Sequence, residues 1–218
     1  MSSSKTLTRM DYILETDKRP FLKSSDVCYY LYEYASGKGY EHSDSNRQIM
    51  NFKKPISKKD TNEWKHRNDA IKNFAQILHS QLNGKAFTII PCPTSKRIDD
   101  PNYNDRLIKL CEELGKLSVN YDIQQCIITT KSHEEMHLHK GQRDPAIISQ
   151  YIEWVEPTRI PNEWVILIDD VYTSGAHFRA YSDLATKHLL KHGCRIAGVF
   201  LAKSTYTYLE RCLNYKPK

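Results

Sequence analysis

The spacing of apolar residues along the chain changes near residue 85. Before this point, residues 61–82 repeat apolar side chains every three or four positions, which predicts a helix that ends at Asn83-Gly84. Beyond it, short apolar runs alternate with longer amphipathic stretches. The runs at residues 87–91, 123–128, 164–168 and 196–201 predict strands, and the stretches 107–117, 145–154 and 176–189 predict helices. This alternation is typical of an α/β fold with a mostly parallel sheet flanked by helices.

The first 84 residues have a different pattern. Residues 27–34 contain four tyrosines and predict a strand, residues 46–54 are compatible with a strand or a helix, and residues 55–60 predict a loop. The tyrosines suit stacking against a base, and packing in a core explains them equally well. We expect an N-terminal subdomain at residues 1–84, a core at 85–205 and a C-terminal tail at 206–218.

Composition indicates a globular protein without a membrane segment. Of the 218 residues, 39% are hydrophobic and 27% are charged, as is ordinary for a soluble domain. No apolar run approaches the roughly 20 residues that span a bilayer, and no apolar stretch follows the polar N-terminus as it would in a secretory signal. The six cysteines are scattered without a CxxC pair, so we expect reduced thiols in a cytoplasmic protein.

The net charge is +6, from 32 basic and 26 acidic residues. This moderate positive excess suits a polyphosphate ligand, and it also suits weak contact with nucleic acid. Because the basic residues are dispersed, nucleic acid is compatible with the sequence without being indicated by it. A homodimer is likewise compatible with the sequence.

The most informative segment begins where the apolar run 164–168 ends. Asp169 and Asp170 come directly after this run, and a small turn of Thr173, Ser174 and Gly175 leads from them into a helical pattern. Two carboxylates at the end of a buried strand are costly to dehydrate, which favours a polar ligand beside them. The N–H groups at a helix start favour a phosphate. The segment therefore indicates a site for a phosphorylated ribose, whereas an aspartate that only caps the turn would leave the second carboxylate unexplained.

Residues 165–177 resemble the phosphoribosyl pyrophosphate (PRPP) signature of type I phosphoribosyltransferases. The resemblance implies that fold, with an N-terminal hood that selects the acceptor. It also implies that Asp169 and Asp170 contact the ribose hydroxyls and act in catalysis. The 5′-phosphate would then be wrapped by Tyr172, Thr173, Ser174, Gly175, Ala176 and His177. His177 departs from the family, which usually has threonine or serine there.

A second loop, residues 91–97, follows the first predicted core strand. It resembles the pyrophosphate-binding loop of the family, most closely in the ComF-like branch, where Pro-x-Pro precedes basic residues. The pyrophosphate would be bound by Thr94, Ser95, Lys96 and Arg97. A proline-stiffened surface loop is the alternative. The cysteine-rich zinc module common in ComF-like proteins is absent, since Cys28 is the one cysteine in the first 85 residues.

A polar segment at residues 129–144 matches the position of the mobile catalytic loop of the family. Such a lid excludes water while pyrophosphate leaves, and Arg143 resembles the basic catalytic residue of the ComF-like branch in this region. An exposed polar loop is the alternative. The histidines at 133, 137 and 139 also suggest a metal site, although no matching cluster of ligands occurs elsewhere.

Together these resemblances imply a phosphoribosyltransferase that moves the 5-phosphoribosyl group of PRPP to a small-molecule acceptor and releases pyrophosphate. Its cofactor would be Mg²⁺, bound mainly through PRPP. One alternative is a non-catalytic PRPP- or nucleotide-binding regulator acting in DNA-linked processes, and another is an effector in a defence system. A DNA-reading helix with clustered arginines would favour the regulator, and residues 1–85 show no such pattern.

Overall fold

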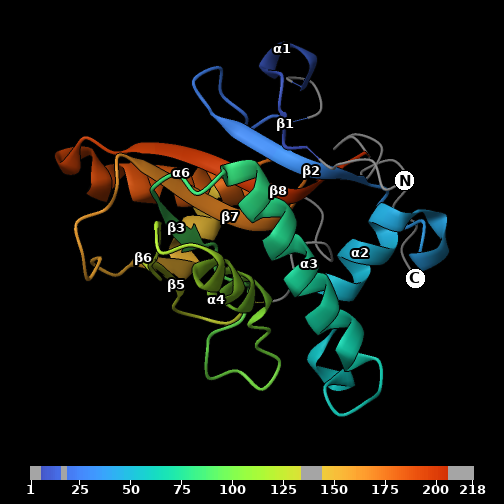
Figure 1. Ribbon diagram of the computed structural model, residues 1–218. Coiled ribbons are helices and arrows are strands. Elements are labelled where there is room, and N and C mark those ends of the chain that lie inside the picture. Colours follow the sequence, from blue (N-terminus) through green and yellow to red (C-terminus); the bar gives the residue numbers. More distant parts are fainter. Residues whose placement is uncertain (1–5, 16–18, 134–143, 206–218) are drawn as a thin grey trace.

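The computed structural model describes residues 6–15, 19–133 and 144–205, and within them most strands form one sheet (Figure 1). This six-stranded sheet has the order β1 (Thr8–Arg9), β2 (Cys28–Tyr34), β8 (Arg195–Ser204), β7 (Trp164–Tyr172), β3 (Phe87–Pro91) and β4 (Tyr121–Ile123). Only the edge strand β1 pairs antiparallel; the other described neighbours in the sheet are parallel. The predicted α/β class with a mostly parallel sheet is confirmed.

Helices cover both faces of the sheet. On one face lie α2 (Asp44–Phe52), α3 (Trp64–Leu82) and α4 (Arg106–Leu117), and on the other lies α6 (Ala176–Leu189). Successive strand residues point to opposite faces, so Ile89 packs with the first group of helices and Ile90 with the second. Both faces of the sheet are therefore buried, which explains why the strands read as continuous apolar runs.

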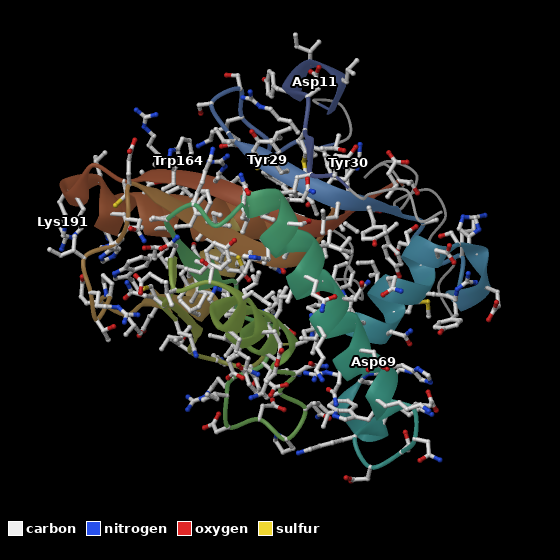
Figure 2. All side chains as sticks on the ribbon, viewed as in Figure 1. Asp11, Tyr29, Tyr30, Asp69, Trp164 and Lys191 are labelled. Atoms are coloured by element: carbon white, nitrogen blue, oxygen red, sulfur yellow. The ribbon has the colours of Figure 1, made fainter. Side chains whose placement is uncertain are left out.

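The predicted helix before residue 83 is confirmed as α3. Its apolar residues Phe74 and Leu78 are fully buried, whereas Asp69 lies on its exposed face (Figure 2). Asn83 follows with a φ of 51°, a left-handed conformation that ends the helix. The ambiguous segment 46–54 is helical, since α2 covers most of it, and residues 55–60 contain only the short 3-10 turn η2 (Ile56–Lys58).

Residues 1–84 contribute to the sheet as well as to its helical cover. β2 lies inside the sheet, parallel to β8 on one side and antiparallel to β1 on the other. Short helical turns precede and follow it, namely α1 (Tyr12–Glu15) and η1 (Tyr40–His42). Of the β2 tyrosines, Tyr32 packs edge-to-face on Phe74 with ring centroids 5.8 Å apart, while Tyr29 and Tyr30 are half-buried (Figure 2).

Two predicted elements are wrong in detail. The single strand expected at 123–128 is two strands, because β4 ends at Ile123 and the chain leaves the main sheet before β5 (Ile127–Thr129). The helix expected at 145–154 stops early: α5 (Pro145–Ile148) and η3 (Ser149–Tyr151) lead into β6 (Ile152–Trp154). β5 and β6 pair antiparallel as a separate two-stranded sheet. This pairing between distant segments overrides the helical spacing of the apolar residues, which is ambiguous in so short a run.

β7 is longer than predicted and continues past Ile168 to Tyr172. The two aspartates therefore belong to the strand itself. The C-terminal end of α6 continues into η4 (Leu190–His192). Gly193 follows with a φ of 70°, and this left-handed conformation ends the helical segment before β8. None of the helices in the described parts of the chain is both long and apolar enough to cross a membrane.

Candidate functional site

The two loops singled out in the sequence lie side by side at the carboxyl edge of the sheet. β3 and β7 are neighbours, with Pro91 paired to Ile168. The Cys92 N–H donates to the Ile168 carbonyl at 2.9 Å, and the Tyr181 hydroxyl of α6 donates to the Pro93 carbonyl at 3.2 Å. The loop after β3 thus begins beside Ile168, directly before the two aspartates, and contacts α6, at the edge where ligands bind in open α/β sheets.

Asp170 is buried and paired with two cations. Lys53, which directly follows α2, lies 3.3 Å from one carboxylate oxygen through its Nζ. Arg106, the first residue of α4, donates to the other oxygen from Nε at 2.9 Å and from Nη2 at 2.6 Å. Burial would raise the pKa of Asp170, but the charges and hydrogen bonds of Lys53 and Arg106 outweigh it and lower the pKa below its ordinary value. Asp170 is therefore an anion at neutral pH.

Asp169 has the opposite environment. Its side chain is half-buried, it accepts a hydrogen bond from the Asp170 N–H at 2.7 Å, and it has no ion-pair partner among the described residues. Burial and, second, the charge of Asp170 raise its pKa to about 7. Successive side chains of a strand point to opposite faces, so the two adjacent carboxylates leave β7 in different directions.

The turn after β7 has the backbone form expected of a tight strand-to-helix connection. Gly175 is the N-terminal cap of α6 with a φ of 87°, and a Cβ at this position would overlap the Tyr172 hydroxyl. Tyr172 is 2% exposed and packs edge-to-face on Phe200 at 4.7 Å. Its side chain therefore belongs to the core, and Ala176 is likewise buried. Of the six residues expected around a phosphate, these two and Gly175 offer only backbone N–H groups.

The side chains of the other turn residues differ in accessibility. Thr173 and His177 are half-buried, and Ser174 is buried, with its Oγ accepting a hydrogen bond from the Ala176 N–H at 3.4 Å. The N–H groups at the start of α6 precede the first residue that bonds within the helix, since the Arg179 N–H donates to the Gly175 carbonyl at 2.8 Å. The positive end of α6 therefore faces this turn.

A segment at residues 19–26 braces the same turn from the N-terminal side. The Phe21 N–H donates to the Ser174 carbonyl at 3.4 Å. Arg179, on the first turns of α6, donates from Nε to the Phe21 carbonyl at 3.3 Å and forms an ion pair with the buried Asp26. The bracing segment and α6 thus hold the turn between them.

The loop expected to bind pyrophosphate is held by contacts with residues 129–133. The Thr94 carbonyl accepts from the Thr129 hydroxyl at 2.6 Å, and the Ser95 carbonyl accepts from the His133 N–H at 3.0 Å. Arg97 is exposed and donates to both oxygens of Asp99 at 2.9 and 2.8 Å. Lys96 is half-buried and lines a neighbouring cavity. The Arg97 guanidinium also donates from Nη1 to the Thr130 carbonyl at 3.1 Å, so both Asp99 and Thr130 engage it.

That cavity has a volume of about 420 Å³. Residues of the loop 91–98, the start of α4 and β5 line it, with Leu107, Ile108 and Ile127 forming apolar walls and Gln125 and Glu153 supplying polar groups. Its volume and mixed lining are in the range of small-molecule sites. The structure thus places a ligand-sized space beside the carboxyl edge of β3.

Some expected site residues lie outside the described residues. These are Arg143 and the histidines at 137 and 139, with most of the segment considered as a lid. Among the residues that the structure does describe, no group of three or more histidine, cysteine, aspartate or glutamate side chains is arranged to hold a metal ion.

Sequence reasoning missed Lys53 and Arg106. Lys53 is 117 positions from Asp170, and Arg106 is 64 positions away. Contacts between such distant residues produce no local pattern. Two signals were available. Lys53-Lys54 is one of the densest basic spots of the sequence, which we interpreted as solvated surface, and Arg106 directly follows residues 102–105, which come after the predicted pyrophosphate loop.

Comparison with known proteins adds no assignment: no protein-family model matches the chain, and no curated protein sequence matches it significantly.

Proposed function

We propose that the protein binds PRPP at the carboxyl edge of β3 and β7 and transfers its phosphoribosyl group to a small acceptor, as a type I phosphoribosyltransferase does. The observation that carries this proposal is the β7–α6 connection. There, a strand with two carboxylates near its end passes through a glycine with a φ of 87° into the N-terminus of a 14-residue helix. This arrangement offers carboxylates for sugar hydroxyls and backbone N–H groups for a phosphate within one turn.

Each part of the edge has a role in this proposal. The turn at residues 173–177 would bind the 5′-phosphate, and Asp169, which has no described cation partner, would accept hydrogen bonds from a ribose hydroxyl. The C1–O bond to pyrophosphate breaks, the pyrophosphate leaves with the electron pair, and a lone pair of the acceptor forms the new bond to C1. We propose the 420 Å³ cavity beside β3 as the acceptor site.

The proposal includes a Mg²⁺ cofactor bound mainly through PRPP. Mg²⁺ is commonly held by substrate phosphates with one or two protein carboxylates. Asp169 fits the role of the protein carboxylate. When bound, Mg²⁺ would neutralise charge on the departing pyrophosphate.

A binding protein without catalysis is the second candidate, and one observation favours it. Both oxygens of Asp170 are already occupied by Lys53 and Arg106. A carboxylate held in this way is poorly available to a ribose hydroxyl unless the cations move, so the edge could serve recognition alone.

Calorimetry with PRPP and Mg²⁺ tests the proposed site. At pH 8, above the pKa of about 7 of Asp169, wild type should bind at micromolar to millimolar PRPP. Asp169→Asn should weaken binding about tenfold there, because an amide lacks the charge-assisted hydrogen bond of a carboxylate. Glu163→Gln is the control. It removes an exposed carboxylate directly before β7, at the opposite end of the strand from the proposed site, and the variant should bind like wild type. Absence of heat at millimolar PRPP would reject the proposal, and binding without pyrophosphate release in the presence of any nucleobase would favour the second candidate.

A further inference from the structure

Beyond the two loops identified in the sequence, a cationic cluster lies on the α2–α4 side of β7. It contains four cations: Lys53 and Lys54 directly after α2, Arg67 on α3 and Arg106 on α4. They pair with three carboxylates, Glu63, Asp105 and Asp170. The cluster therefore has an excess of positive charge. The N-terminus of α4, which begins at Arg106, adds the positive end of a 12-residue helix.

The cluster is built into the fold rather than scattered over the surface. Arg67 is 2% exposed, stacks over Trp64 at 4.5 Å, and donates to the Asn104 side-chain oxygen at 3.1 Å. The Asn104 amide in turn donates to the Lys54 carbonyl at 2.9 Å, and its oxygen accepts from the Arg106 N–H at 3.2 Å. Asn104 and Arg67 thus fix the end of α2 against the start of α4, and with them the positions of Lys53 and Arg106.

Lys53 and Arg106 are the members of the cluster that a ligand at the sheet edge would meet. Their side chains are 31% and 14% exposed, and both reach the same carboxylate, Asp170. Asp170 is three residues before Thr173, so the Cα atoms of the two residues are at most about 11 Å apart. The carboxylate that Lys53 and Arg106 share and the turn at 173–177 therefore belong to the same part of the sheet edge.

We infer that Lys53 and Arg106 form a binding site for the diphosphate group of the ligand, with Asp170 as the internal anion that pairs with them when no ligand is bound. This inference rests on the proposed function for the identity of the ligand. It adds Lys53, directly after α2, and Arg106, on α4, to the loop residues expected to bind the diphosphate. Their shared carboxylate, Asp170, belongs to the sheet edge itself, whereas Arg97 pairs with Asp99 on an exposed loop. An anion with two or more charges competes with a single carboxylate for the two cations, and the displaced Asp170 becomes available to the ligand's hydroxyls.

Titration calorimetry with inorganic pyrophosphate, ribose 5-phosphate, PRPP and ADP tests this inference, with Mg²⁺ present throughout. Lys53→Met and Arg106→Gln should each weaken pyrophosphate and PRPP binding about tenfold, because each removes a charge-assisted contact, and should leave ribose 5-phosphate affinity within about twofold. Lys53→Arg should retain most of the affinity. Lys58→Met is the matched control, since it removes one exposed lysine that pairs with Glu63 and should bind like wild type.

The outcomes separate this inference from the proposed function. If wild type binds pyrophosphate and Lys53→Met does not, the diphosphate site is supported, even if ribose 5-phosphate and PRPP fail to bind. In that case, binding of ADP would identify a nucleotide as the source of the diphosphate. Ribose 5-phosphate binding without pyrophosphate binding overturns the diphosphate site and leaves the proposed function standing. Unchanged pyrophosphate affinity in Lys53→Met also overturns it. Should Arg106→Gln fail to fold, as circular dichroism would reveal, Lys53→Met decides the question alone.

Discussion

Asp169 and Asp170 are neighbours in the sequence, yet the fold separates their acid–base behaviour. The pKa of Asp170 is lowered because two cations outweigh its burial, whereas the pKa of Asp169 is raised to about 7 by burial and by Asp170. The sequence predicted that both carboxylates belong to one polar site. It contained no information on which would be charged, because that depends on Lys53 and Arg106, which reach β7 from separate helices.

The raised pKa of Asp169 predicts a specific pH dependence of stability. Between its ordinary value of 3.8 and about 7, the folded state holds a proton that the unfolded state releases. The stabilising contribution is therefore complete below pH 3.8 and is lost as the pH rises through about 7. Asp169→Asn removes it, so the free energy of unfolding of wild type minus that of the variant should fall between pH 4 and pH 8. Urea denaturation across this range measures the difference, and a difference that is constant or rises would contradict the raised pKa.

Two buried tyrosines provide a second test at the residue scale. The Tyr172 hydroxyl is buried without a hydrogen-bond partner among the described residues, whereas the Tyr181 hydroxyl donates to the Pro93 carbonyl. An unsatisfied buried hydroxyl costs about 1–3 kcal/mol, so Tyr172→Phe should stabilise the protein by about 1 kcal/mol and Tyr181→Phe should destabilise it by a similar amount. Urea denaturation of the matched pair measures both changes. Equal losses of stability would show that Tyr172 has a partner in solution.

At the scale of elements, prediction succeeded where the signal was local. The end of α3 at Asn83, the entry into α6 through Gly175 and the apolar centre of β7 all follow from neighbouring residues. Prediction failed for residues 145–154, where β6 exists only because Ile152 and Trp154 pair with the distant β5. The same limit applies to the site. The β7–α6 turn was recognisable from the sequence, but the pairing of Arg97 with Asp99 and of Asp170 with Lys53 depends on the folded conformation and was not.

At the scale of the whole molecule, residues 1–84 are joined to the rest through the central sheet and a buried ion pair. The predicted division into a subdomain and a core was based on the change in the spacing of apolar residues. In the structure, β2 lies between β1 and β8 of the central sheet, and Asp26 pairs with Arg179, 153 positions away, with only 7% and 9% of the two side chains exposed. A sheet that includes strands from both parts has one continuous core on each face, so we expect the two parts to unfold together.

This expectation gives a prediction for the Asp26–Arg179 ion pair. Removing one partner of a buried pair leaves an uncompensated charge, so Asp26→Asn should lower the free energy of unfolding by about 3 kcal/mol. Asp183→Asn is the matched control: it removes a partner of the same Arg179, but this carboxylate is 55% exposed, so the loss should stay below about 1 kcal/mol. Urea denaturation followed by both tryptophan fluorescence and circular dichroism should show a single coincident transition for all three proteins. Two separate transitions, with only the first one shifted by Asp26→Asn, would instead show that residues 1–84 form an independently unfolding subdomain.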